Sequence, residues 1–269
     1  MTLTRLPGPL AGSDDQLTNY RIDGPAHRLL MHPFPRRVRA EFAGETVLDT
    51  RNGVLVHETG LQPQLYVPEG DLRADLLKST DLHTHCPFKG DASYRSIHVG
   101  DRVAENAVWN YPDPIASAPW LAGYAALYWD RVDRWLDEDE EVVGHLPDPF
   151  HRVDIRATSQ RVRVLAGDPQ NGTVVADSSR ALLLSETGLP NRYYLPAEDI
   201  KTELLTTTVT RTVCPYKGWA SYWTVNLDGL ELSDAVWGYQ EPLPESARIV
   251  GYRSFLHEQL TTEVDGQPL

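Results

Sequence analysis

Two short strings in this chain combine a thiol with an amine. Residues 86–90 read CPFKG and residues 214–218 read CPYKG, so each string places a lysine three residues after a cysteine. A cysteine becomes a nucleophile when a nearby cation lowers its pKa, which makes these residues candidates for catalysis. For the cysteines a structural role is the preferred interpretation, because free cysteine often packs as a small apolar group. For the lysines, which can project from a turn, the structural and functional interpretations are equally open. The catalytic candidates are Cys86, Lys89, Cys214 and Lys217.

Aromatic side chains follow both strings at matching distances. They are Tyr94, Trp109 and Tyr111 after the first string, and Tyr222, Trp223, Trp237 and Tyr239 after the second. A Trp-x-Tyr spacing puts both rings on one face of a strand. Such rings either form the core of a small sheet or line a concave ligand site. We group Tyr222 with the catalytic candidates and the other rings with ligand binding.

Carboxylates and histidines supply the remaining candidate chemistry. Glu58 and Glu186 each precede a Thr-Gly pair. Each is either a surface residue or a general base near a cysteine. We group Glu186 with the ligand-binding candidates. His83 and His85 would face the same side of a strand, as metal-ligating pairs do. An incidental pair is the preferred interpretation, and Arg211 and Val213 at the aligned positions confine any such site to the first repeat. The sequence therefore predicts neither a metal site nor a cofactor.

These candidates recur because the chain repeats itself. A shift of 128 positions superimposes the ETGL strings at 58 and 186, the CPxKG strings, and the VWxY strings at 108 and 236, without a gap. A repeat of about 100 residues has the size of an independent domain, far longer than a solenoid repeat. The duplication predicts an N-terminal arm (1–32), a first domain (33–129), an acidic, Pro-rich linker (130–150), a second domain (151–258) and a C-terminal tail (259–269).

The segments outside the repeats carry their own expectations. Val132, Trp135 and Leu136 have helical spacing, so a short amphipathic helix is expected before the Pro-rich part of the linker. The five acids at 137–141 are interpreted as a solvated surface segment. Residues 1–32 show no counterpart in the second repeat, and we expect an arm that packs on the domains or stays partly disordered.

Within each repeat the pattern is that of β-structure. Residues 54–56, 181–184, 206–214 and 219–225 are apolar, β-branched or aromatic and predict strands. Residues 215–218 suit a hairpin turn, while 71–77 and 199–205 predict short helical turns. The alternation of strands with long helices that marks nucleotide-binding α/β domains is missing. The fold class expected is mainly β, with two tandem small antiparallel β domains.

The repeated strings also resemble a known family. CPFKG with ASY, CPYKG with ASYW, and the downstream VWNYPDP and VWGYQEP are similar to the domain-of-unknown-function family 427. The resemblance covers both repeats, and it implies a compact β-tent-like fold, tandem copies, and occurrence in bacterial and some fungal proteins. It implies no reaction. A nucleotidyltransferase-like label is sometimes attached to the family, but the chain has no phosphate-binding loop motif.

The first repeat departs from this pattern where the second keeps it. Phe88, Asp91, Arg95 and Leu127 stand where the second repeat has Tyr216, Trp219, Trp223 and Phe255. Divergence after duplication often leaves one copy in the ancestral form. We therefore expect the second repeat to hold any ligand site that keeps the family's form.

Composition limits the classes of function. The formal net charge of −13 opposes binding to nucleic-acid phosphates. No apolar run reaches about 18 residues, so no membrane span is expected. The N-terminus lacks a signal-like apolar stretch and two cysteines cannot build a disulfide framework, which favours a cytoplasmic protein.

The function expected is the binding or conversion of a small molecule in an aromatic-lined pocket, with the cysteine and lysine of the CPxKG turn near the site. The reaction is not inferable. The alternatives are a non-catalytic module for a small ligand or peptide, and a purely structural or interaction protein. Retention of the string in both copies favours an enzyme. We also expect the two repeats to pair within the chain.

Overall fold

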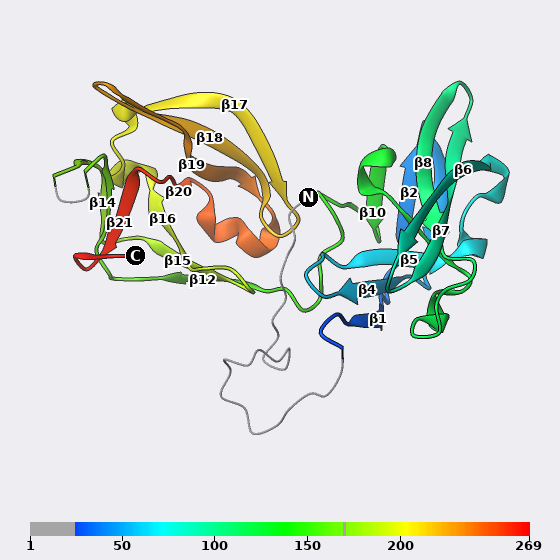
Figure 1. Cartoon of the computed structure of the whole chain (residues 1–269). Helices are drawn as coiled ribbons and strands as arrows, with labels where there is room; N and C mark the ends of the chain where they lie inside the picture. The colour runs from blue at the N-terminus through cyan, green and yellow to red at the C-terminus, as the bar shows by residue number, and fades with distance from the viewer. Residues whose placement is uncertain (1–24, 169–170) are drawn as a thin grey trace. The chain divides into compact units, whose positions relative to one another are not determined.

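The computed structural model describes residues 25–168 and 171–269 (Figure 1). The chain divides into two compact units, with the boundary between Asp148 and Pro149. Most of the predicted N-terminal arm, residues 1–24, lies outside the described residues. Each unit is built from two antiparallel sheets, which we call its large sheet and its small sheet.

The first unit joins these sheets through short loops. In order of neighbouring strands, its large sheet contains β1 (Leu29–Pro33), β4 (Val54–Glu58), β5 (Gln64–Pro68), β9 (Tyr124–Leu127), β8 (Arg102–Asn110), β7 (Gly90–Val99) and β6 (Leu77–Cys86). Its small sheet contains β11 (Glu140–Glu141), β10 (Arg134–Asp137), β2 (Val38–Phe42) and β3 (Glu45–Thr50). Single 3-10 turns occur at η1 (Glu69–Asp71), η2 (Ala74–Leu76), η3 (Pro119–Leu121) and η4 (Trp129–Arg131).

The second unit repeats the same topology. Its large sheet contains β12 (Val153–Ala157), β15 (Leu182–Glu186), β16 (Arg192–Pro196), β20 (Tyr252–Phe255), β19 (Leu230–Pro242), β18 (Gly218–Leu227) and β17 (Leu205–Cys214). Its small sheet contains β14 (Thr173–Ser178), β13 (Val162–Ala166), β21 (Leu260–Val264) and β22 (Gln267–Pro268). The 3-10 segments are η5 (Ala197–Asp199), η6 (Thr202–Leu204) and η7 (Pro244–Ile249). The predicted mainly antiparallel β fold in two similar halves is confirmed.

Each large sheet is apolar on both faces. Because neighbouring residues of a strand point to opposite faces, Val108 and Trp109 on β8 enter different clusters. Val108 joins an inner core with residues of the small sheet, whereas Trp109 joins an outer cluster with Tyr66 and Leu121. The Val-Trp pair of β19 is divided in the same way. The candidate rings therefore belong mainly to the outer face of the large sheet.

The helix expected around Trp135 is wrong. Residues 134–137 form β10, which pairs with β2, and Trp135 is buried in the inner core. Three apolar residues within five positions do not distinguish a helix from a strand, and pairing with β2 decides between them. The structure also places strands in the predicted linker and in the predicted C-terminal tail, since β10 and β21 occupy equivalent places in the two small sheets.

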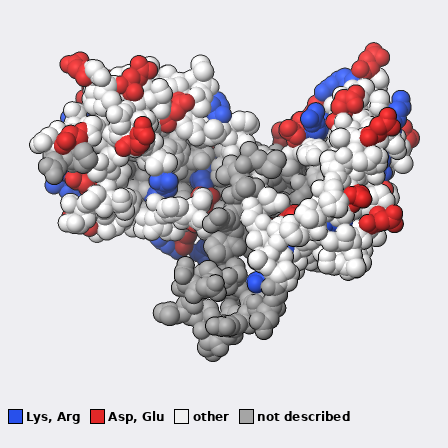
Figure 2. Space-filling model, viewed as in Figure 1, with Lys and Arg blue, Asp and Glu red and all other residues white. Residues whose placement is uncertain are grey.

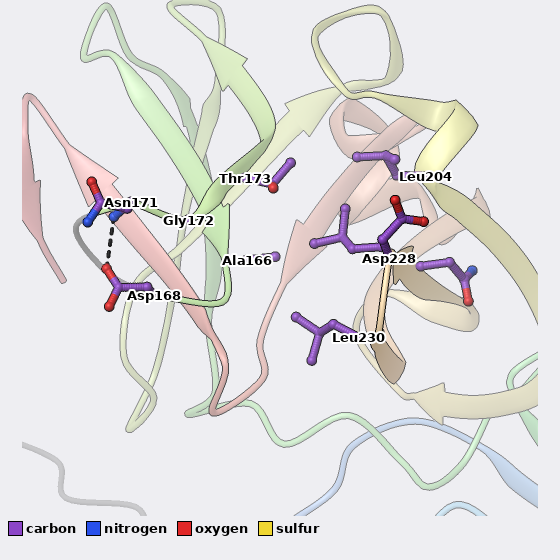
Figure 3. Close-up of a pocket in the computed structure, with 10 residues that line it drawn as sticks. Ala166, Asp168, Asn171, Gly172, Thr173, Leu204, Asp228 and Leu230 are labelled. Carbon is purple, nitrogen blue, oxygen red and sulfur yellow. Dashed lines mark hydrogen bonds between the residues drawn. The ribbon is translucent and has the colours of Figure 1, made fainter.

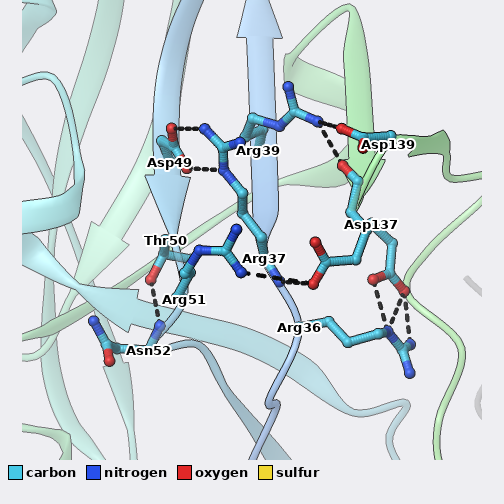
Figure 4. Close-up of polar contacts among 10 residues, drawn as sticks. Arg36, Arg37, Arg39, Asp49, Thr50, Arg51, Asn52, Asp137 and Asp139 are labelled. Atoms are coloured by element: carbon cyan, nitrogen blue, oxygen red, sulfur yellow. Dashed lines mark hydrogen bonds and ion pairs between the residues drawn. The ribbon is translucent and has the colours of Figure 1, made fainter.

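Arginines in β2 and just before it pair with acidic residues at the end of β10 and after it (Figure 4). The side chain of Arg36 pairs with Asp137 at 2.6 Å, and that of Arg39 pairs with Asp139 at 2.8 Å. Asp139 is almost fully solvent-exposed whereas Asp137 is largely covered. Part of the segment is therefore exposed to solvent. The other part forms ion pairs with β2 and with the residue Arg36 that precedes it.

The arm predicted at 1–32 also needs correction where it is described. β1 pairs with β4 as β12 pairs with β15, so residues 29–32 do have a counterpart in the second repeat. The offset here is 124 positions rather than 128, because the loop after β13 is four residues longer than the loop after β2. The insertion hides this part of the duplication from a fixed-offset comparison.

Figure 2 shows acidic side chains dispersed over the visible faces of both units rather than gathered in one patch. Within the described residues, no helix is both long and apolar enough to cross a membrane.

Candidate functional site

A cluster of three polar side chains, two of them buried and His27 partly exposed, lies at the turn between β6 and β7. The ammonium group of Lys89 donates a hydrogen bond to Glu58 Oε2, and Glu58 Oε1 lies 2.9 Å from His27 Nε2. The side chains of Lys89 and Glu58 are only 10% and 9% exposed. A buried charge pair is tolerated when each partner neutralises the other. Lys89 therefore points inward to a carboxylate, and does not project into solvent.

The turn itself depends on Gly90. Its φ of +111° lies in a region that side-chain-bearing residues rarely adopt. An added Cβ would come within 3.2 Å of the carbonyl oxygen of Asp113. The loop after β8, which contains Asp113 and Ile115, also bonds the turn through its backbone, because Ile115 N donates to Lys89 O at 3.1 Å. Glycine is thus required to bring Lys89 beneath the loop that follows β8.

The second unit contains the same cluster. Lys217 donates to Glu186 Oε2, and His151 Nε2 lies 3.0 Å from Glu186 Oε1. Burial raises the pKa of Glu186, but the His151 hydrogen bond and the charge of Lys217 outweigh burial and hold the pKa below its ordinary value. The histidine ring stacks on the turn in each unit, with centroids 3.6 Å apart for His27 and Phe88 and 4.1 Å apart for His151 and Tyr216.

Tyrosine hydroxyls connect the rings of the outer cluster. Trp109 Nε1 donates to the Tyr66 hydroxyl at 3.3 Å, and Trp237 Nε1 donates to the Tyr194 hydroxyl at 3.2 Å. The hydroxyls of Tyr94 and Tyr222 bond the threonine hydroxyls of β6 and β17 at 2.9 and 2.8 Å. Burial is the main cause that raises the pKa of the buried tyrosines Tyr66, Tyr111, Tyr194 and Tyr239. These phenols are neutral at physiological pH.

A cavity of about 800 Å³ opens over the rings of the first unit. Among the residues that line it are four of the predicted site residues: Lys89, Tyr94, Trp109 and Tyr111. Tyr128 also lines the cavity, with its ring centroid 4.4 Å from that of Trp109. Burial and a hydrogen bond with Tyr94 raise the pKa of Tyr128 to about 12. The cavity is therefore lined both by aromatic side chains and by the Glu58–Lys89 pair, whose ammonium nitrogen lies 6.0 Å from the ring centroid of Tyr111.

The two cysteines occupy equivalent positions beside the outer clusters. Cys86 and Cys214 are free thiols, partly buried, and each packs against the outer cluster of its unit. Their carbonyl oxygens accept the backbone N–H of Lys89 and Lys217 across the turn. The lysine ammonium groups are directed to Glu58 and Glu186. The structure thus pairs each amine with a carboxylate, where the sequence had suggested a thiol.

The predicted residues of the second unit fall on two faces of the sheet. Cys214, Tyr222, Trp237 and Tyr239 share the outer cluster, close to Glu186 and Lys217. Trp223 instead lies in the inner core, with the Arg253 guanidinium 4.3 Å from its ring centroid. Arg192 places its guanidinium carbon 6.0 Å from the centroid of Trp237. The structure therefore separates Trp223 from the other candidates.

One comparison with known proteins identifies the family. The chain matches the family described as Domain of unknown function (DUF427) over residues 30–138 and again over residues 154–266. The chain belongs to the DUF427 family. No curated protein matches the chain. The two matched segments of the DUF427 domain contain both CPxKG turns, and they extend into the strands β10 and β21 that the repeat comparison left out.

A second cavity lies in the other DUF427 domain, away from its CPxKG turn (Figure 3). Its volume is about 650 Å³, and it lies between the loop after β13 and the turn between β18 and β19. Leu204, Asp228 and Leu230 stand on one side of it, and Asp168 accepts a hydrogen bond from Asn171 N on the other. None of the predicted site residues in the described part of the chain is among its lining residues.

The histidines of β6, His83 and His85, are exposed, and each contacts a side chain on the neighbouring strand β7. His85 Nδ1 lies 2.6 Å from Asp91 Oδ1, and His83 Nδ1 lies 3.5 Å from Ser93 Oγ. Within residues 25–168 and 171–269, no group of three or more His, Cys, Asp or Glu side chains could hold a metal ion.

Sequence reasoning missed the histidines of the buried clusters. His27 was assigned to an arm without a counterpart, and His151 was given no role. Residues 25–28 and 149–152 both read Pro-x-His-Arg, which is a detectable signal at an offset of 124. Tyr128 was also missed, because its counterpart in the second unit is Leu256 and the internal comparison gave it no weight.

Proposed function

We propose that the first unit binds a small organic molecule in the cavity over Trp109. The observation that carries the proposal is the cavity itself, about 800 Å³ in volume and lined by Trp109, Tyr111 and Tyr128 as well as by the buried Glu58–Lys89 pair. Pockets for small ligands typically have volumes of roughly 300–1,000 Å³ and mostly apolar walls with a few polar groups. The ring-rich walls support the first unit as the binding unit, in place of the second unit that the sequence favoured.

The two kinds of lining residue, aromatic and polar, suit two parts of one ligand. The faces of Trp109 and Tyr128 would contact an apolar or planar portion, and burial of that portion would supply most of the affinity. Lys89 retains donors beyond the one engaged by Glu58, since an ammonium has three N–H bonds. The Tyr94 hydroxyl adds a further polar group. These groups would fix the orientation of the ligand.

A thermal-unfolding screen tests the proposal. A ligand that binds only the folded protein stabilises it by RT ln(1 + [L]/Kd), which is about 2.7 kcal/mol at a concentration of 100 Kd. We expect at least one compound of a panel of small cationic, neutral and anionic metabolites to raise the melting temperature. We also expect it to quench or shift tryptophan fluorescence, because Trp109 lines the cavity.

A matched pair of variants separates the cavity from the rest of the surface. Leu61 lines the cavity, and its counterpart Leu189 in the second unit is an exposed residue outside it. Leu61→Trp should fill part of the space and weaken binding, whereas Leu189→Trp should leave binding unchanged. Equal loss in both variants, or a panel without a single binder, would contradict the proposal.

Catalysis in the same cavity is the second candidate. Glu58 lies between His27 and Lys89 at the cavity wall, an arrangement that can relay a proton. The predicted catalytic residue Lys89 would then act on bound ligand. Mass spectrometry of each binder after incubation with the protein would detect a product, and His27→Gln should slow its formation more than it weakens binding. An unchanged ligand after prolonged incubation excludes this candidate for that ligand.

A further inference from the structure

We propose that the ligand of the first unit is an organic cation, whose ammonium, amidinium or guanidinium group lies against the ring of Trp109. This inference rests on the proposed function and assigns its ligand class. It follows from a difference between two equivalent tryptophans, Trp109 on β8 and Trp237 on β19.

The second unit holds a cation over its tryptophan. The guanidinium carbon of Arg192 lies 6.0 Å from the ring centroid of Trp237, within the range of a cation–π contact. Arg192 begins β16, and the equivalent first residue of β5 is Gln64. The amide of Gln64 is neutral and donates to the carbonyl oxygens of Leu65 and Leu127, at 3.2 and 3.3 Å. The first unit thus lacks the protein cation at this position.

The cavity is found where that cation is missing. Gln64 and Trp109 both line it, together with Tyr128 and Trp129. Tyr128 replaces Leu256 of the second unit, and its ring packs directly against that of Trp109, with centroids 4.4 Å apart. Aromatic side chains gathered around one space are the usual means of recognising quaternary ammonium and related cations. A cation from solution would restore the contact that Arg192 makes in the second unit.

The charges around the cavity do not oppose a cation. Glu58 and Lys89 neutralise each other, and the 3-10 turn η4 contributes one charge of each sign, Asp130 and Arg131. Tyr66, Tyr111 and Tyr128 are uncharged at physiological pH, and burial raises their pKa values further. The local balance is close to neutral, so the ring faces decide between ligand charges. The chain's net charge of −13 favours the approach of a cation.

Isothermal titration with ligands of matched shape tests the assignment. Benzamidinium, benzamide and benzoate have nearly the same size and carry charges of +1, 0 and −1. Choline and 3,3-dimethylbutan-1-ol form a second pair, with and without a cation. Desolvated cation–π contacts correspond to roughly tenfold or greater differences in affinity. We expect the cation of each set to bind at least about tenfold more tightly than its neutral counterpart, and benzoate to bind most weakly.

Two reciprocal substitutions locate the site. Gln64→Arg places on β5 the cation that the second unit has on β16, and it should abolish cation binding while the protein remains folded by circular dichroism. Arg192→Gln uncovers Trp237 and should add a second, weaker site, because Leu256 supplies no second ring there. The second variant keeps the test informative if the first does not fold.

The outcomes separate the ligand class from the proposed function. If benzamide or benzoate binds as tightly as benzamidinium, and Gln64→Arg abolishes this binding, the cavity is a binding site but the cation assignment is wrong. If no compound binds and neither substitution creates or removes a site, both proposals fail. A cation that binds equally to wild type and Gln64→Arg also overturns the assignment, because its site is elsewhere.

Discussion

The two units share one polar cluster but differ in what surrounds their tryptophans. In both units a histidine, a glutamate and a lysine form the same contacts at nearly the same distances, although His27 is more exposed than His151. Next to this constant cluster, the first unit has Gln64 and Tyr128 at the positions where the second unit has Arg192 and Leu256. The two units thus share the polar cluster and differ in the residues around Trp109 and Trp237.

This difference suggests separate roles for the two sets of residues. The cluster joins the segment that precedes β1 or β12, and the end of β4 or β15, to the hairpin turn that contains the lysine. The presence of the cluster in both units is expected if its contacts stabilise the fold of each unit. The rings and the residues at 64 and 192 vary, as expected of residues that determine ligand binding. The predictions below test whether the cluster acts equally in both units.

The largest effect is expected from removing the lysine of either cluster. Lys89→Met and Lys217→Met leave a buried glutamate carboxylate without its main counter-charge, and such losses typically cost about 3–5 kcal/mol. We expect the free energy of unfolding of the affected unit to fall by about 3 kcal/mol in each case, since the histidine remains as a partner. Urea denaturation followed by tryptophan fluorescence measures both values.

Double variants provide the control. Glu58→Gln with Lys89→Met, and Glu186→Gln with Lys217→Met, remove both charges and should be less destabilised than the single lysine variants. A large cost in the second unit with almost none in the first would contradict a shared structural role. It would indicate that water in the cavity already solvates Glu58.

Much of the fold could be predicted because the chain provides two copies of the same signals. Val-Trp strings, CPxKG turns and Thr-rich segments predicted the strands and the hairpins around residues 86–90 and 214–218. A short apolar pattern in a single copy, such as that around Trp135, gave a wrong prediction. Trp135 belongs to a strand because it pairs with β2, and no pattern of three apolar residues can reveal such a distant partner.

The site was predicted only in part, for a related reason. Strand alternation places Trp109 and Tyr111 on one face, and that inference needs only local sequence. The contact between Lys89 and Glu58 joins residues 31 positions apart, and the contact of His27 with Glu58 spans the same separation. Nothing in the local sequence distinguishes a lysine aimed at a thiol from one aimed at a distant carboxylate.

A smaller effect is expected from the cysteines that the sequence proposed as nucleophiles. Cys86→Ala and Cys214→Ala remove a partly buried thiol from equivalent positions in the outer clusters. Each should lower the free energy of unfolding by about 1 kcal/mol, the common size for a conservative deletion. Ligand binding measured by titration should be unchanged in both variants. A loss of product formation in either variant would restore the thiol to a catalytic role.

The smallest effect concerns the pH dependence contributed by Glu186. Its pKa in the folded protein is held below the ordinary value by His151 and Lys217 despite burial, so the unfolded chain takes up the proton first as the pH falls. The stabilisation is therefore complete above the unfolded pKa of about 4.3 and is lost as the pH falls through the lower, folded pKa. Glu186→Gln cannot titrate at this position. The difference in unfolding free energy between wild type and Glu186→Gln should be constant from pH 7 to about pH 5 and shrink towards pH 3, whereas a difference that grows on acidification would show that burial outweighs the two partners.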